Sequence, residues 1–290
     1  MLIFGKTGQL GWELNRTLAP LGEMYAFGPD ELDLINIDAL VRAIHDVQPQ
    51  VIVNASAFTA VDQAEKEPDL AMLLNEKVPM VMAEEARKLN AAFVHYSTDY
   101  VFDGTKTSAY TEEDRTNPLN VYGQSKLKGE QAIGQVGGAN VILRTSWVYS
   151  LRGAGFVSKV LSWARKQETL KIVTDQVGSP TWARMLAEAT AAMIARSLPD
   201  AQAYFAERNG VYHLGGAGGV SRFDFTRAIL EFDPRPQEQI VRNFEAALTA
   251  DFPTPALRPL FTELDCSRFE RVFGLRLPDW KIALQWAMGE

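Results

Sequence analysis

The sequence predicts an α/β protein built on a doubly wound, Rossmann-like parallel sheet, with a smaller α/β domain towards its C-terminus. Three observations support this fold class. Short apolar runs alternate with longer segments of helical period, which is the βαβ pattern of a parallel sheet. Each run is apolar at successive positions, which indicates strands covered by helices on both faces. The length of 290 residues exceeds one ordinary domain of roughly 100 to 200 residues.

The elements divide the chain near its middle. Strands are predicted at 51–53, 92–94 and 141–143, and helices near 37–47, 69–89 and 121–135. The alternation ends after Tyr149, where residues 151–155 form a predicted loop before a helix over about 156–166. We therefore expect a first domain over 1–149 and a second that occupies most of 150–290. A helix over 181–196 is expected to return and pack on the sheet of the first domain.

Composition narrows the class of protein. The formal charge of −7 and the absence of a Lys/Arg cluster argue against binding to nucleic acid or to an anionic membrane. No apolar run approaches the ~20 residues that a membrane helix needs. Cys266 is the single cysteine, which excludes an internal disulfide and a cysteine-based zinc site, and the three histidines are scattered. We expect a cytoplasmic protein without a metal site.

A glycine turn follows the first predicted strand. Leu2–Phe4 leads into Gly5, Gly8 and Gly11, ahead of a helical pattern. Glycines at this place permit a tight turn and a close approach of the backbone to a pyrophosphate, while the helix N-terminus offers unpaired N–H groups to the anion. The alternative is an incidental turn. The position of the glycine turn between a strand and a helix instead favours a dinucleotide site. The spacing of its glycines is typical of short-chain dehydrogenases.

The end of the second predicted strand bears on the choice of cofactor. A carboxylate there usually holds the ribose hydroxyls, whereas a nearby Arg admits a 2′-phosphate. Residues 26–33 contain no Arg or Lys, and Asp30 or Asp33 is available to the adenosine. Among NADH and NADPH, this stretch favours NADH.

A tyrosine and a lysine stand one helical turn apart. Tyr122 and Lys126 share a face of a predicted helix, where a cation stabilises a phenolate and makes the phenol a better proton donor. Thr98 ends the predicted strand before this helix, at the sheet edge where open α/β sheets bind ligands. The spacing alone is common and Thr98 is also compatible with a turn cap, but together they predict reduction of a carbonyl group.

Asn75 lies in a helical stretch just ahead of Pro79, which tends to distort the preceding turn. A polar residue at such a distortion is suited to a water relay. A plain surface asparagine is the open alternative.

Several segments resemble the extended short-chain dehydrogenase/reductase superfamily and, within it, the dTDP-4-dehydrorhamnose reductases. The resemblance covers essentially the whole chain and is carried by Phe4–Leu14, His95–Phe102, Pro118–Gly123, Arg144–Tyr149, Asp175–Thr181, Arg258–Pro259 and Pro278–Trp280. It implies NAD(P)H-dependent reduction of the 4-keto group of dTDP-4-dehydro-L-rhamnose. The product, dTDP-L-rhamnose, is a precursor of cell-surface polysaccharide.

The resemblance also implies roles for single residues. Thr98, Tyr122 and Lys126 would be catalytic, and Thr98, Asp99 and Trp147 would contact the sugar. The residues expected at the cofactor, glycine turn included, are Gly5, Gly8, Gln9, Leu10, Gly11, Asp33, Leu34, Ala57, Phe58, Thr59, Tyr96, Tyr122 and Lys126.

Three positions depart from the pattern of the family. Gly28 stands where many relatives have an acidic residue, Gly155 replaces an Asn, and Thr262 stands where a Ser is common. Some relatives pair through Mg²⁺ at a glutamate matching Glu13. A lone glutamate on the first helix is more often solvated, so we assign Glu13 no metal role, and a homodimer remains open.

Two other functions share parts of this pattern. A nucleotide-sugar 4,6-dehydratase or 4-epimerase would have the same glycine turn, Tyr122 and Lys126. Dehydration needs a further acid/base pair, whereas Asp99 is followed by Tyr100. A non-catalytic regulatory subunit is the alternative from another class, and the intact Thr98, Tyr122 and Lys126 count against it.

The sugar nucleotide is predicted to bind between the domains. Trp147 leaves the carboxyl edge of the sheet where the second domain begins, and offers an apolar face to a deoxysugar. Arg258 is predicted to meet a phosphate in a bidentate, charge-assisted contact. The alternative is that Trp147 packs between the domains and Arg258 is solvated.

Overall fold

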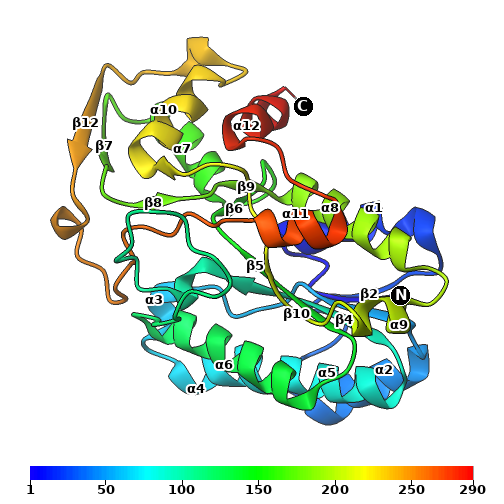
Figure 1. Cartoon of the computed structure of the whole chain (residues 1–290). Helices are drawn as coiled ribbons and strands as arrows, with labels where there is room; N and C mark the ends of the chain where they lie inside the picture. Colours follow the sequence, from blue (N-terminus) through cyan, green and yellow to red (C-terminus); the bar gives the residue numbers. More distant parts are fainter. Residues whose placement is uncertain (290) are drawn as a thin grey trace.

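The computed structural model describes residues 1–289, which contain a central sheet of six parallel strands in the order β10-β5-β4-β3-β1-β2 (Figure 1). The strands are β1 Leu2–Phe4, β2 Tyr25–Phe27, β3 Val51–Asn54, β4 Ala92–Thr98, β5 Asn140–Thr145 and β10 Gly210–His213. The three strands expected near 51, 92 and 141 are confirmed. The order reverses beside β1, and such a switch point opens a crevice for ligands at the carboxyl ends of the strands.

One face of the sheet packs on helices from both halves of the chain (Figure 1). These helices are α1 Gln9–Thr17, α8 Ala183–Ser197, α9 Ala201–Ala206 and α11 Ser267–Phe273. Ile3 and Val53 of the strands share a buried core with Leu14, Met193 and Phe269 of the helices. The predicted return of a helix near 181–196 is therefore confirmed.

The other face packs on helices of the first half. They are α2 Ile37–Val47, α5 Val78–Lys88 and α6 Val121–Val136, and the short α3 Val61–Ala64 and α4 Pro68–Met72 lie ahead of α5. Leu2 and Ile52 meet Leu40 and Ile133 in a second buried core. Neighbouring strand residues thus enter opposite cores, which explains why each strand is apolar without alternation.

The helix expected over 69–89 is interrupted. A π-helical turn, Leu73–Lys77, separates α4 from α5 directly ahead of Pro79. The distortion predicted before this proline is therefore present. It carries the fully buried Asn75, so the surface alternative for Asn75 is wrong.

A second region, at the upper left of Figure 1, has its own core. Its elements are α7 Phe156–Ala164, β7 Thr169–Val173, β8 Val177–Gly178, β11 Val220–Ser221, α10 Arg222–Glu231, β12 Asn243–Ala247 and α12 Trp280–Met288. A strand pair, β6 Val148–Tyr149 with β9 Thr181–Trp182, connects it to the sheet. Because β9 occupies the first residues of the predicted 181–196 helix, α8 begins at Ala183. Residues after 150 contribute to both regions. Short 3₁₀ turns lie at Ala19–Leu21, Asp99–Val101, Pro236–Glu238 and Thr249–Asp251.

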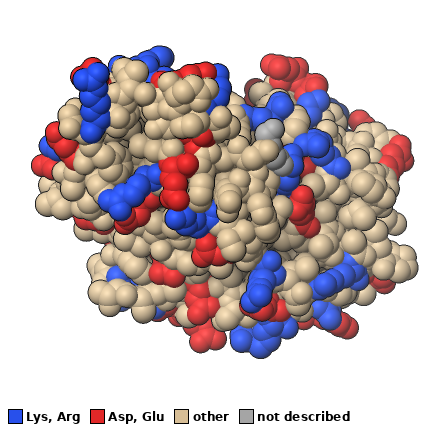
Figure 2. Space-filling view, turned by 90° about the horizontal axis from the view of Figure 1, so that it is seen from above, with Lys and Arg blue, Asp and Glu red and all other residues tan. Residues whose placement is uncertain are grey.

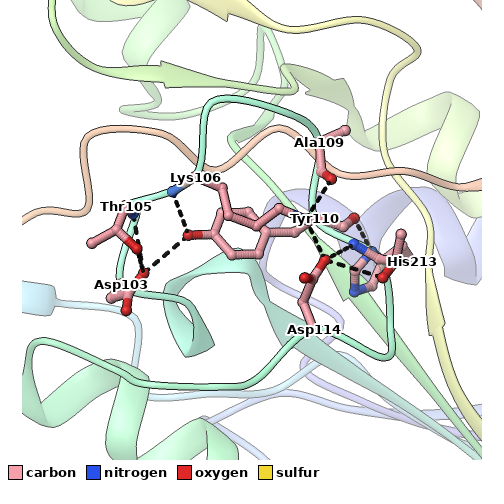
Figure 3. A network of polar contacts seen from close by, with 8 residues as sticks. Asp103, Thr105, Lys106, Ala109, Tyr110, Asp114 and His213 are labelled. Carbon is pink, nitrogen blue, oxygen red and sulfur yellow. Dashed lines mark hydrogen bonds and ion pairs between the residues drawn. The ribbon is translucent and has the colours of Figure 1, made fainter.

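The segment between β4 and α6 is held by Tyr110 (Figure 3). Its hydroxyl donates to Asp103 Oδ1 (3.0 Å), and Lys106 Nζ donates to Asp114 Oδ2 (2.6 Å). Burial lowers the pKa of His213 to about 3, so the ring is neutral, and its Nδ1 lies 3.0 Å from the Tyr110 carbonyl oxygen. These contacts fix the chain that enters α6 against the edge strand β10.

Charges of both signs are interspersed on the face seen in Figure 2. Within residues 1–289 no helix combines the length and the apolar character needed to cross a membrane.

Candidate active site

A cleft of about 950 Å³ runs along the carboxyl ends of the strands, from the glycine turn to Trp147. Most residues predicted for the site line it: Gly5, Gly8, Gln9, Leu10, Asp33, Leu34, Ala57, Thr59, Tyr96, Thr98, Asp99, Tyr122, Lys126 and Trp147. Two ends of the predicted site, the phosphate turn and the Tyr122/Lys126 pair, therefore share one cavity. Gly11, Phe58 and Arg258 do not line it.

The glycine turn is too crowded for side chains. Gly5 has φ +90°, and a Cβ there would lie 2.7 Å from Ser56 N. A Cβ on Gly11 would lie 2.0 Å from the Gly5 carbonyl oxygen, so Gly11 serves close packing of α1 on the turn. Gly8 caps α1 without a side-chain hydrogen bond. This open helix N-terminus and the bare turn fit a dinucleotide pyrophosphate.

Asn75 connects the loop after β3 to α6. Its Oδ1 accepts from Phe58 N (2.9 Å), and its Nδ2 donates to Phe58 O (3.0 Å) and Ser125 Oγ (2.9 Å). Ser125 Oγ donates in turn to the Tyr122 carbonyl oxygen (2.8 Å). The backbone of Phe58 is thus linked through Asn75 and Ser125 to the first turn of α6, and its expected contact with the cofactor stays a prediction.

Lys126 is buried against β4 beside His95. Asn54 Oδ1 accepts from Ser56 N (3.0 Å), which directs Asn54 Nδ2 to His95 Nδ1 (3.1 Å). On the other side of the ring, His95 Nε2 lies 3.1 Å from Lys126 Nζ. Nζ also donates to the Tyr96 carbonyl oxygen (2.6 Å).

The pKa values of this group follow from burial. Burial lowers the pKa of Lys126 to about 8, against the influence of Glu130. Burial, with a smaller effect of Lys126, places the pKa of His95 well below its usual value. Burial raises the pKa of Tyr122, and a hydrogen bond with Thr98 opposes the rise. Tyr122 therefore keeps its proton at neutral pH and is available as a proton donor.

Asp99 is buried among hydroxyl groups. Its Oδ1 accepts from Thr98 Oγ1 (3.1 Å), and its Oδ2 accepts from Ser146 Oγ (2.8 Å) and Thr262 Oγ1 (2.6 Å). Burial raises the pKa of Asp99, and these three hydrogen bonds oppose the rise. Thr262, one of the departures from the family pattern, keeps the hydroxyl that this arrangement uses.

Comparisons with known proteins agree with this geometry. The chain matches the model of the RmlD substrate binding domain over residues 1–290. It is 42% identical to a dTDP-4-dehydrorhamnose reductase of Burkholderia thailandensis, over 98% of this chain and 96% of the relative. For the reductase of Escherichia coli the values are 39%, 100% and 97%. The chain belongs to the RmlD family.

A solved structure similar to this chain contains a nicotinamide cofactor. The dTDP-4-dehydrorhamnose reductase of Bacillus anthracis, in complex with NADP, superposes with a TM-score of 0.88 at 32% identity, over 98% of this chain and 96% of the other. This RmlD-family chain is therefore a nicotinamide-dependent oxidoreductase. Its six-stranded sheet and glycine turn are the expected frame for that cofactor.

The loop after β2, which borders the cleft at Gly28, carries both signs of charge. Lys6 Nζ pairs with Glu31 Oε1, and Glu31 Oε2 accepts from Gly28 N (2.8 Å). A Cβ on Gly28 would lie 2.9 Å from Thr7 Cγ2 and 3.2 Å from Glu31 Oε2. Glu31 thus supplies a carboxylate beside Gly28. The sequence reasoning missed Lys6, because this cation reaches the second strand from the glycine turn.

Trp147 lines the cleft as predicted, whereas Arg258 lies outside the cleft lining. Trp147 lines the cleft in a left-handed backbone conformation, φ +45°, which is unusual for a bulky residue and often found at functional sites. Arg258 makes a bidentate pair with Asp62, at 2.8 Å and 2.7 Å. The guanidinium of Arg258 thus has a carboxylate partner in place of the solvent expected as the alternative, and the clamp on one ligand stays a prediction.

Glu13 is buried, with 4% of its surface exposed, so its interpretation as a solvated residue is wrong. Its Oε2 lies 3.6 Å from both Arg16 and Arg184. Among residues 1–289 no group of three His, Cys, Asp or Glu side chains is placed to hold a metal ion.

Proposed function

We propose that this chain reduces the 4-keto group of dTDP-4-dehydro-L-rhamnose to dTDP-L-rhamnose, with NADH or NADPH as cofactor. The observation that carries the proposal is the joint position of Thr98, Tyr122 and Lys126 in the cleft that begins at the glycine turn. The names of the RmlD relatives supply the substrate.

The proposed chemistry follows from the state of each side chain. When bound, the reduced nicotinamide supplies a hydride to the carbonyl carbon. Tyr122 donates a proton to the carbonyl oxygen, because its raised pKa leaves it protonated at neutral pH. Thr98 donates its hydroxyl proton to that oxygen, in exchange for the hydrogen bond that it makes to Asp99 Oδ1 in this structure. Lys126 has a pKa of about 8 and is therefore mostly protonated at neutral pH. Its ammonium stabilises the phenolate that remains.

The remaining site residues have binding roles in the proposal. We assign the cofactor to the cleft residues from Gly5 to Leu10, with Asp33, Leu34, Ala57, Thr59 and Tyr96. The sugar then lies at Thr98 and Trp147, in the part of the cleft nearest the second region. Residues 1–149 would hold mainly the cofactor, and residues 150–290 would supply most of the nucleotide contacts.

The experiment that tests the proposal is an assay of the purified protein with dTDP-4-dehydro-L-rhamnose and each cofactor in turn. Oxidation of NADH or NADPH with formation of dTDP-L-rhamnose is expected. If neither cofactor is oxidised while both bind, the chain is not this reductase. Formation of an epimer without net oxidation would indicate the epimerase activity.

Two broader properties belong to the same proposal. A cytoplasmic location is supported by the free thiol of Cys266, the single cysteine of the chain. A homodimer is compatible with the family, and the mass of the purified protein in solution decides it.

A further inference from the structure

Arg222, the first residue of α10, is a cation without a protein acceptor. Its guanidinium stacks on the ring of Trp147, with 3.4 Å from Cζ to the ring centroid, and lies 4.6 Å from that of Phe156. Within residues 1–289 no carboxylate or carbonyl oxygen hydrogen bonds to this guanidinium. Of the other arginines near the cleft, Arg144 pairs with Glu130 and Arg258 with Asp62, whereas Arg152 is exposed and stacks on Trp12.

A second cavity begins at Arg222. It has a volume of about 480 Å³ and lies between α7, β7 and the turn after β12. Aromatic and aliphatic side chains form most of its wall, and Lys171 and Gln176 add polar groups; besides Arg222, the main lining residues are Phe156, Trp163, Lys171, Ile172, Gln176 and Phe252. An apolar cavity with a few polar groups is suited to a flat heterocyclic ring.

Trp147 and Arg222 connect this cavity to the cleft. Trp147 lines the cleft together with Thr98 and Asp99, and Arg222 lies on the Trp147 ring and lines the second cavity. A ligand whose sugar lies at Thr98 and whose base fills the second cavity would therefore pass the guanidinium with the group that joins them.

We propose that Arg222 binds the diphosphate of the sugar nucleotide and that the second cavity holds its nucleoside. This inference rests on the proposed function, because it names the subsite for the dTDP part of that substrate. Two phosphate oxygens match the fork of a guanidinium, which forms strong bidentate, charge-assisted hydrogen bonds.

The electrostatics of Arg222 agree with this role. Burial lowers its pKa to about 10, against the nearby Tyr100 and Asp99, so the group is still charged at neutral pH. Arg222 is only partly exposed and has no acceptor from the described residues, so an anionic ligand would supply the charge partner that it lacks. Arg258 is less suited, since its bidentate pair with Asp62 already uses the same donors.

The test compares dTDP with thymidine as probes of the wild-type protein and of Arg222→Met. The variant should bind dTDP roughly 10- to 100-fold more weakly, the range for a hydrogen bond to a charged group, and should raise the KM for the sugar nucleotide by a similar factor. Thymidine, which lacks phosphate, should bind both proteins alike. The affinity for NADPH should not change.

Two further variants keep the result interpretable. Arg222→Lys retains the charge without the planar fork, and an intermediate loss of dTDP affinity is expected. Arg227→Ala removes an exposed arginine of the same helix that pairs with Asp224 at 3.8 Å, and should bind dTDP as the wild type does.

Unchanged dTDP affinity in Arg222→Met would overturn the inference, as would an equal loss for dTDP and thymidine, which indicates a collapsed site. Failure of the proposed function gives a different pattern, in which the wild type binds dTDP through Arg222 but does not reduce the 4-keto sugar.

Discussion

The part of the cleft at β4 and the second cavity at α10 differ in how their polar groups are satisfied. At β4, Lys126 contacts His95 and the Tyr96 carbonyl oxygen, and Asp99 accepts from three hydroxyls. At α10, Arg222 has ring contacts but no acceptor within residues 1–289. The polar groups of the proposed chemical end are thus held by the protein, whereas the cation of the proposed nucleotide end is held by aromatic rings alone among the described residues.

This difference predicts which kinetic constant depends on each of the two regions. Polar groups that are already oriented cost little reorganisation when charge develops on the reacting oxygen. Arg222, which has no protein acceptor among the described residues, instead forms its charged hydrogen bonds only when an anionic ligand binds. It should therefore contribute to the binding free energy more than to turnover. Changes at β4 should therefore affect kcat, and changes at α10 should affect KM.

The largest effect is expected for Tyr122→Phe. Loss of a positioned proton donor should lower kcat by roughly 10² to 10⁴. NADPH affinity, measured by fluorescence titration, should change little, because the ring remains. Near-normal turnover of this variant would remove Tyr122 from the proposed mechanism.

The buried Lys126 should make stability depend on pH. Its pKa of about 8 in the folded protein lies below the ordinary value of 10.5, so between these values the unfolded chain binds a proton that the folded protein has lost. The free energy of unfolding should therefore rise with pH in this window, by at most about 1.4 kcal/mol per pH unit, and show no such dependence below it.

Urea unfolding at several pH values between 7 and 10 measures this dependence, with Lys126→Met as the control that lacks the titrating group. The wild type should gain stability relative to the control as the pH rises above 8. Parallel curves for the two proteins would mean that Lys126 has an ordinary pKa.

The Lys6–Glu31 pair should set the response to the cofactor's 2′-phosphate. Because Glu31 neutralises Lys6, we still expect NADH to serve at least as well as NADPH. Lys6→Ala should lower kcat/KM for NADPH about tenfold and leave NADH unchanged, since only NADPH offers a phosphate to the ammonium. Glu31→Gln should favour NADPH. Equal losses with both cofactors in Lys6→Ala would contradict a 2′-phosphate contact.

The smallest effect on the KM is expected for Arg258. A comparison of Arg258 with Arg222 shows which of the two arginines binds the phosphate. Because Arg258 is bonded to Asp62, a double-mutant cycle of Asp62→Ala and Arg258→Ala should give a coupling energy of about 1 kcal/mol in unfolding experiments. The KM for the sugar nucleotide should change less in Arg258→Ala than in Arg222→Met. The opposite order would restore the phosphate contact first predicted for Arg258.

Local patterns explain what the sequence could predict. Tyr122 and Lys126 share a helix face by spacing alone, Thr98 ends an apolar strand, and the glycine turn lies between a strand and a helix. The partners of Asp99 could not be inferred this way, since Thr262 lies 163 residues away in the sequence. For the same reason Arg258 was assigned to a phosphate, although its partner Asp62 is 196 residues distant.

Arg222 shows a different limit of sequence reasoning. It follows Ser221, whose hydroxyl accepts from Asp224 N (2.9 Å), so locally it resembles any residue at a capped helix start. Its value as a candidate comes from the stacking on Trp147 and from the missing acceptor. Both are tertiary properties that no spacing in the sequence indicates.

The proposed reduction is tested most directly by following a labelled hydride. Purified protein is given dTDP-4-dehydro-L-rhamnose and NADPH or NADH carrying deuterium at the transferred position, and the product is analysed by NMR. The account predicts one deuterium at C4 of dTDP-L-rhamnose for each cofactor oxidised. A product without deuterium, formed while the cofactor stays reduced, would contradict it.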